Sequence, residues 1–201
     1  MSTEYRPAAS RVLAAVIGVV CAIGLGALTI DQGIGGLARH GSWIVLPAVI
    51  CWALFWNPRV DVDEAGVVLV NVLRTIRLPW PAIRAVDTKW ALNLDTAYGR
   101  FTAWAAPGPG RHANRDISSL EIEHLPESSR GDGGGLRPGD SPRSSSGLAA
   151  IAVRRQWEAL RDAGHLDNPR LEFERPPVMW HVGMMGAVAA LLALGVAGLV
   201  L

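Results

Sequence analysis

The chain is short of cysteine, of lysine and of charge. Its 201 residues contain two Cys and one Lys, and 18% of them are charged, whereas a soluble domain carries about 25%. Cys21 and Cys51 both lie in apolar runs, which excludes a disulfide scaffold and a cysteine zinc site of ordinary ligand number. The net charge of +1 argues against a nucleic-acid partner, which calls for a basic excess.

Motifs for catalysis and metal binding are also missing. None of the five His lies three or four residues from another, so the helical zinc motif is absent. The glycines at 131–135 are not followed by the Gly-Lys-Ser/Thr of a phosphate-binding loop, and those at 33–36 follow no strand. No Ser stands in a recognisable motif with His and Asp. We therefore expect no enzyme activity, no metal and no cofactor.

Three apolar runs, at 12–30, 43–56 and 178–201, predict three transmembrane helices. The first spans roughly 28 Å as a helix, close to the hydrocarbon thickness of a bilayer. A secretory signal is its alternative, but that would have a shorter apolar core and a cleavage site of small residues. The second run is short and contains Pro47, so a buried core helix is its alternative.

Two features favour a membrane for the second run. Its Trp and Phe residues are typical of the aromatic belt at a membrane interface, and only the predicted loop 31–42 separates it from the first run, as in a helical hairpin. In the third run, Gly183 and Ala187 have the spacing of a small-residue face. That face either packs on the first helix or simply faces lipid.

Basic residues predict the orientation of these helices. One side would carry five Arg, and the hairpin loop would carry Arg39 alone. Because basic residues accumulate on the cytoplasmic side, the N-terminus (1–11) and the region 57–177 are predicted to be cytoplasmic. The five Arg are Arg6, Arg11, Arg59, Arg170 and Arg175.

Residues 57–106 have the pattern of a small antiparallel β domain. Short stretches of alternating or β-branched residues begin near 60, 67, 74, 83, 89 and 100, with turns close between them. The segment 107–147 is rich in Gly, Pro and Ser and is predicted to be a mostly flexible insertion. Its residues 117–125 alternate apolar and polar side chains, which predicts a strand or half a turn of helix at the edge of the sheet. Residues 148–164 repeat apolar side chains at helical spacing, which predicts an amphipathic helix with Arg154 on its solvent-exposed face. Residues 165–177 are a predicted linker.

Within the β segment, the run Gly66–Thr75, followed by Leu78-Pro79-Trp80 and Ile83, resembles the signature of bacterial PH-like domains. The chain resembles in particular the form of this domain that is attached to transmembrane helices and is common in actinobacterial membrane proteins. The resemblance implies an α+β membrane protein, in which a curled antiparallel sheet is capped by a C-terminal helix. It brings no known ligand.

Four residues are the predicted binding group, for lipid or for a protein partner: Arg74, Arg77, Trp80 and Arg84. Lys89 and Arg100 would extend the group. Residues 57–107, however, include six basic and five acidic residues. A domain that binds anionic lipid would concentrate positive charge. Ordinary solvated strand charges, with Trp80 in the core, are the alternative. The sequence therefore favours a non-catalytic scaffold at the membrane, with a protein or a second copy of the chain as its partner. An anionic-lipid sensor and an accessory subunit of a transporter or envelope complex are its alternatives.

Overall fold

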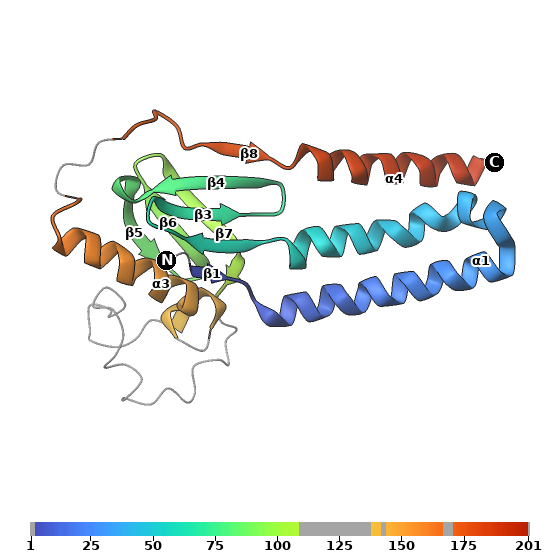
Figure 1. The fold of residues 1–201 in the computed structure, drawn as a ribbon, viewed down its shortest axis with the longest axis horizontal. Coiled ribbons are helices and arrows are strands. Elements are labelled where there is room, and N and C mark those ends of the chain that lie inside the picture. The colour runs from blue at the N-terminus through green and yellow to red at the C-terminus, as the bar shows by residue number, and fades with distance from the viewer. Residues whose placement is uncertain (1–2, 109–137, 142–143, 167–170, 201) are drawn as a thin grey trace. The chain divides into compact units, whose positions relative to one another are not determined.

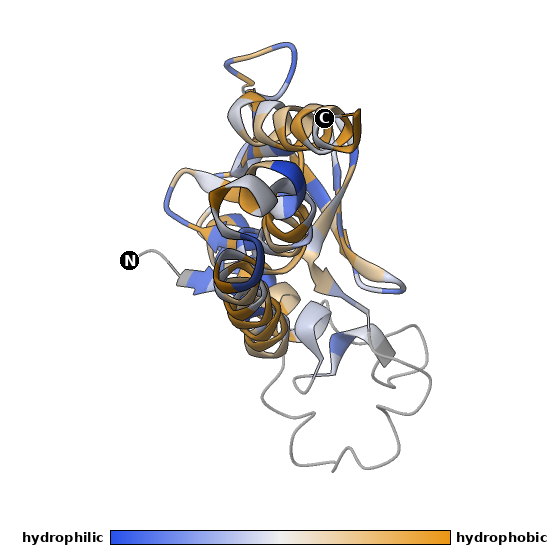
Figure 2. Ribbon diagram, turned by 90° about the vertical axis from the view of Figure 1, so that its right-hand side faces the viewer, coloured by the Kyte–Doolittle hydropathy of each residue, from blue (hydrophilic) through white to orange (hydrophobic). Residues whose placement is uncertain are grey.

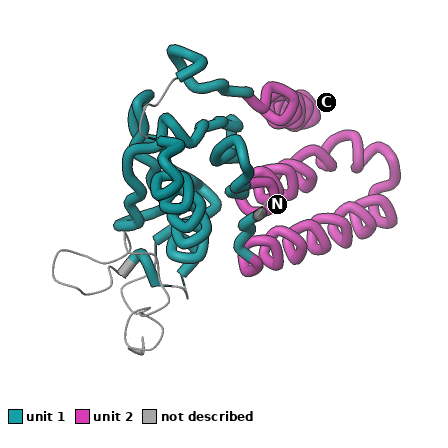
Figure 3. Tube along the Cα trace, turned by 60° about the vertical axis from the view of Figure 1, so that its left-hand side comes forward, with its two compact units in different colours: residues 1–7, 59–179 teal, residues 8–58, 180–201 magenta. Residues whose placement is uncertain are grey.

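The computed structural model describes residues 3–108, 138–141, 144–166 and 171–200. They form two compact units (Figure 3). The β domain comprises residues 1–7 and 59–179, and the helical unit comprises residues 8–58 and 180–201. The chain therefore starts in the β domain, leaves it for the helical unit, returns and leaves again.

The helical unit is built on α1 (Ala8–Cys51), which reverses direction at Gly33 (Figure 1). Gly33 has φ 64° and ψ −159°, a backbone conformation that is open to glycine and costly for other residues. The 44 residues of α1 would extend about 66 Å if straight, which is roughly twice the hydrocarbon thickness of a bilayer. A π-helical turn, η1 (Trp52–Trp56), continues α1, and α4 (Val182–Val200) completes the unit.

Two helices, Ala8–Trp56 and Val182–Val200, are long and apolar enough to cross a membrane within the described part of the chain, where the sequence predicted three. Figure 2 shows their mainly hydrophobic colouring. The predicted loop 31–42 is wrong, because these residues are helical on both sides of Gly33. The predicted start of the last helix at residue 178 is also wrong, since 178–180 form strand β8.

Glycines on α4 mediate its packing on the second limb of α1. Gly195 and Gly198 are buried, and the Trp43 indole donates a hydrogen bond of 3.1 Å to the Gly195 carbonyl. A Cβ on Gly198 would collide with the carbonyl of Arg39. The small-residue face therefore lies in the last two turns of α4, and a Cβ on Gly183 would meet no described atom within 4 Å.

Replacing Gly198 by leucine should separate α4 from α1, because the obstacle is backbone that cannot rotate away. Overpacking of this kind costs about 1–3 kcal/mol. The expected result is a lower midpoint of thermal unfolding for the full chain in detergent. Gly186→Leu is the matched control, since a Cβ there meets no described atom within 4 Å. Equal midpoints for the two variants would contradict the packing.

The β domain contains two antiparallel sheets (Figure 1). Sheet A has the strand order β1-β2-β3-β4-β8 and sheet B the order β5-β6-β7. The strands of sheet A are β1 (Thr3–Tyr5), β2 (Arg59–Val62), β3 (Gly66–Val70), β4 (Arg74–Pro79) and β8 (Val178–Trp180). Those of sheet B are β5 (Ile83–Asp87), β6 (Ala91–Thr96) and β7 (Gly99–Pro107). Short 3-10 turns lie at η2 (Trp80–Ala82) and η4 (Pro138–Asp140).

Alternation along the strands creates the core of the β domain. In β2, β3 and β4, every second side chain is buried and joins a cluster with residues of sheet B and of helix α3 (Ser145–Asp162). The largest aliphatic side chains of this cluster are Leu69, Ile76, Leu78, Leu92 and Leu94. The antiparallel sheets and the C-terminal helix predicted from the sequence are therefore confirmed.

The N-terminal strand β1 is an element that the sequence did not predict. It pairs with β2, Tyr5 opposite Val60, and the Tyr5 ring packs against the core. Burial raises the pKa of the Tyr5 phenol above its ordinary value, and a hydrogen bond with Ser145 acts in the opposite direction. The segment before the first apolar helix therefore belongs to the folded β domain.

Helix α3 begins three residues before the predicted start. Ser144 caps it, since its hydroxyl accepts a hydrogen bond of 2.9 Å from the Gly147 amide. Gly164, with φ 75°, ends it as predicted. The prediction that Arg154 lies on the solvent-exposed face of the helix is wrong, because its side chain is 1% exposed.

The predicted flexible insertion 107–147 extends too far at its C-terminal end, because helix α3 begins at Ser145. Gly139, Asp140 and Ser141 are buried, as are Ser146 and Gly147. The Ser146 hydroxyl donates to the Gly139 carbonyl at 2.9 Å, so this Gly- and Ser-rich stretch is packed by its own hydrogen bonds. The predicted strand at 117–125 lies outside the described residues.

Candidate binding face of the β domain

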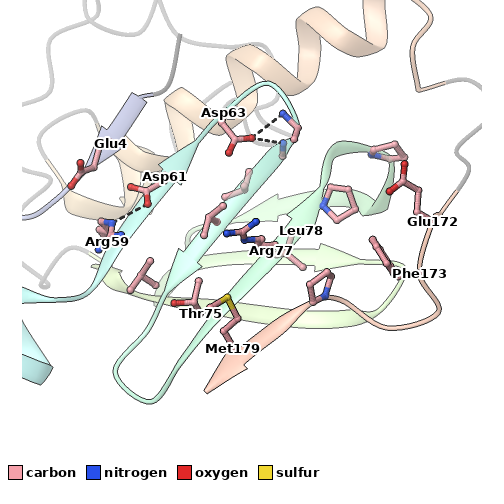
Figure 4. A pocket seen from close by; sticks show the side chains of 18 of the residues that line it. Glu4, Arg59, Asp61, Asp63, Thr75, Arg77, Leu78, Glu172, Phe173 and Met179 are labelled. Carbon is pink, nitrogen blue, oxygen red and sulfur yellow. Dashed lines mark hydrogen bonds and ion pairs between the residues drawn. The ribbon is translucent and has the colours of Figure 1, made fainter. Parts of the chain in front are cut away.

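A hollow of about 1110 Å³ lies over sheet A (Figure 4). Strands β1 to β4 and β8 form its floor, and Glu172, Phe173 and Pro177 line it from the segment that precedes β8. The predicted linker 165–177 therefore contributes residues to a surface feature of the β domain.

The side chains that line this face alternate along the strands with those that fill the core. Along β2 and β4, the side chains between the buried positions point the other way, so that Arg59, Asp61 and Arg77 line the hollow. Because side chains of a strand alternate between its two faces, a polar floor opposite an apolar core follows from the sequence pattern.

Charges of both signs line the hollow, and most are paired locally. Arg59 lies 2.9 Å from Asp61, and Arg6 forms an ion pair with Glu4. Asp63 accepts hydrogen bonds of 2.8 Å from the amides of Ala65 and Gly66, which closes the β2–β3 turn. In the described part of the chain, one carboxylate oxygen of Asp61 is buried without a hydrogen-bond partner.

The lining contains three Arg and four carboxylates: Arg6, Arg59 and Arg77, with Glu4, Asp61, Asp63 and Glu172. Such a balance does not concentrate positive charge, as a specific site for an anionic headgroup would require. A surface with closely spaced charges of both signs is instead complementary to another surface of mixed charge.

The structure does not bring the four predicted binding residues together. Arg74 begins β4, and Arg77 lies in the hollow on the same strand. Arg84 is exposed on β5, in the other sheet. Trp80 is 3% exposed, and its indole donates a hydrogen bond of 3.0 Å to the Asp63 carbonyl. Trp80 is therefore a core residue, whose side chain does not reach the surface.

The two residues predicted to extend this group have local partners. Arg100 bonds Asp95 at 2.9 Å and Asp87 at 3.1 Å, and the hydrogen bond and charge of Asp95, aided by Asp87, raise the pKa of its guanidinium. The Lys89 ammonium lies 5.8 Å from the centre of the Trp90 ring. Neither residue contributes to the hollow over sheet A.

Sequence reasoning missed a buried ion pair below α3. Arg154 lies 2.6 Å from the Asp140 carboxylate, which also accepts a 2.6 Å hydrogen bond from Thr88. The second guanidinium nitrogen of Arg154 donates to the Val86 carbonyl at 2.9 Å. These contacts tie the end of the Gly-rich insertion to helix α3 and to β5. In the sequence, the adjacent Arg154 and Arg155 suggest two solvent-exposed side chains, so nothing there indicates that Arg154 is buried.

A second missed feature is the clamp that Asn71 forms on β7. Its side-chain amide donates to the Thr102 carbonyl at 2.9 Å and accepts from the Trp104 amide at 2.8 Å. An asparagine side chain can thus replace a strand neighbour, since it carries one donor and one acceptor group. The clamp joins the β3–β4 turn of sheet A to sheet B.

The candidate face presents side chains for hydrogen bonds, ion pairs and apolar contact. Within the described ranges, no group of three His, Cys, Asp or Glu could hold a metal ion. His112 and His124 lie outside those ranges. What the hollow offers is a floor of strand side chains with paired charges and a wall that includes Phe173.

Two antiparallel sheets with a C-terminal helix packed against both define the PH-like class of domain. Consistent with that class, residues 57–111 match the family model described as a bacterial PH domain. The PH-like family predicted from the sequence is therefore confirmed for this segment. Neither the curated proteins nor the solved structures contain a match to the chain.

Proposed function

We propose that this chain is an integral membrane protein whose PH-like domain is a non-catalytic interaction module on the cytoplasmic side. Support for the anchor comes from β1 and β2, which are neighbours in one sheet and flank the apolar segment 8–58. A segment that leaves a folded domain and returns to it crosses a bilayer an even number of times. The length of α1, with its reversal at Gly33, suits two crossings, and α4 adds a third.

Basic residues support the cytoplasmic side for the β domain. Arg6, Arg11 and Arg59 flank the double crossing, and Arg175 precedes α4, whereas Arg39 alone lies near the reversal. Because basic residues near helix ends are retained in the cytoplasm, this distribution supports the proposal that the β domain lies inside and the end of α4 outside.

The hollow over sheet A is the feature that best supports a role in binding a partner. The edge strands of the sheet, β1 and β8, are three residues long each, so they offer few backbone groups to a partner strand. A polypeptide partner of mixed charge would instead dock on the face, against Arg77, Asp61 and Phe173. The near balance of charge favours a polypeptide over a lipid headgroup.

Site-specific photo-crosslinking of the full chain tests this function. With benzoyl-phenylalanine at Thr75, which lines the hollow, we expect a covalent adduct of one discrete mass in membranes of the native host. The adduct should disappear in the variant Arg77→Glu, because the charge reversal places like charges against the partner. Ala85, exposed on β5, is the control position. An adduct from Ala85 alone, or none from Thr75, would refute the proposed docking face.

A further inference from the structure

All three connections between the β domain and the helical unit leave sheet A at one end. β1 ends at Tyr5, opposite Val60, and β2 begins at Arg59. β8 starts next to Arg77, whose amide donates to the Pro177 carbonyl at 3.0 Å, and Met179 lies beside Thr75 (Figure 4). β8 therefore runs towards the start of β4. We call this the connection end of sheet A.

The β3–β4 turn, residues 71–73, also lies at the connection end. Arg59 is paired with Val70, the last residue of β3, so the chain turns at 71–73 directly beside the start of β2. The opposite end of the sheet holds the β2–β3 turn, where Asp63 binds the amides of Ala65 and Gly66. The register alone thus places one turn at the connections and the other turn away from them.

Two large apolar side chains are exposed at the connection end. Leu73, in the β3–β4 turn, is 49% exposed, and Trp104 on β7 is 53% exposed. The Asn71 clamp holds the Trp104 amide at 2.8 Å and so brings both residues to one corner of the β domain. Trp is enriched where a protein meets the membrane interface, and the exposed Leu73 adds apolar surface at the same corner.

Charge is distributed along sheet A in the same sense. Arg74 stands at the connection end, at the start of β4, and Arg59 stands there at the start of β2, where it is paired with Asp61 at 2.9 Å. Asp63 and Glu64 stand at the β2–β3 turn, at the opposite end. The cytoplasmic leaflet carries anionic lipid, which attracts basic residues close to its surface. The basic end is thus the one from which the chain continues into the apolar helices.

From this juxtaposition we propose that the corner formed by Leu73 and Trp104 is a membrane-contact site, which inserts into the interfacial layer of the bilayer. The ligand is a lipid surface containing anionic headgroups. The insertion would restrain the β domain on the membrane and leave the hollow over sheet A facing a defined direction. The inference rests on the proposed membrane anchorage, but not on the polypeptide partner.

Fluorescence from a single label tests the site in the full chain. Leu73→Cys, in a background with Cys21→Ala and Cys51→Ala, is labelled with the environment-sensitive dye NBD and reconstituted into phosphatidylcholine–phosphatidylserine vesicles. Ala65→Cys, at the opposite end of sheet A, is the matched control. Since interfacial residues lie about 5–10 Å deep, we expect doxyl-labelled lipid to quench roughly half of the emission from position 73 and almost none from position 65.

The outcomes separate the inference from the proposed function. If the protein floats with the vesicles and resists carbonate extraction, yet position 73 is quenched no more than position 65, the membrane-contact site is refuted and the anchor stands. If carbonate releases the protein, the anchor itself is refuted and the contact site with it. Trp104→Cys, labelled in the same way, repeats the measurement if the Leu73 variant does not fold, and an unquenched label there also refutes the site.

Discussion

Replacing Arg154 by methionine should lower the free energy of unfolding of the β domain by about 3–5 kcal/mol. The substitution removes one partner of a buried ion pair and leaves the Asp140 carboxylate, which is 0% exposed, with the hydrogen bond from the Thr88 hydroxyl. An uncompensated buried charge accounts for the size of the effect. Urea unfolding of the full chain in detergent, followed by hydrogen exchange of peptides from β5 and α3, measures it.

Arg155→Met is the matched control, because Arg155 is the next residue on α3 and is exposed. Surface substitutions of this kind usually change stability by less than about 0.5 kcal/mol. The double variant Arg154→Met with Asp140→Leu should recover much of the loss, since removing both charges leaves neither unpaired. If Arg154→Met unfolds at the same urea concentration as Arg155→Met, the ion pair is not buried as the structure has it.

Replacing Trp80 by alanine should cost about 3–5 kcal/mol, the range for loss of a large aromatic side chain from a core. Trp80 packs among the core residues and bonds the Asp63 carbonyl, so the variant loses both a buried ring and a hydrogen bond. The expected observation is a large drop in the urea midpoint of the β domain. Trp80→Phe should lose much less, because most of the buried ring area is kept.

Trp90→Ala is the control for this measurement, since Trp90 is 80% exposed on the turn between β5 and β6. Its removal should leave the midpoint nearly unchanged. A stable Trp80→Ala variant that fails only in partner or lipid binding would instead restore Trp80 as a binding residue, as the sequence had allowed. The pair of variants therefore separates a core role from a surface role.

The strands between 59 and 107 were predictable because their information is local. Alternating residues such as Val60 and Val62 bury one face of a strand whatever the strand pairs with, and turn residues mark where each strand ends. The match of residues 57–111 to a bacterial PH domain agrees with that reading. The PH-like resemblance likewise depended on a contiguous stretch, Gly66 to Ile83.

The candidate site was much less predictable. Arg74, Arg77 and Arg84 are close in sequence, but β4 and β5 belong to different sheets, so the group does not assemble. The hollow instead contains Glu172 and Phe173, about a hundred residues after β4, which no local pattern connects to it. Asn71 offered a turn signal in sequence, but its clamp on Thr102 and Trp104 is a long-range contact.

The sequence alone determined which apolar surface must be buried: that of the long apolar runs, of the alternating strands and of the amphipathic helix. Burial is a property of each residue, and its periodicity can be read along the chain. Only the tertiary structure decided that Thr3–Tyr5 and Val178–Trp180 complete sheet A, that Gly33 reverses α1 and that Arg154 is paired with Asp140. Those choices depend on which distant backbone and charged groups satisfy one another, and that pairing is settled only when the whole domain is assembled.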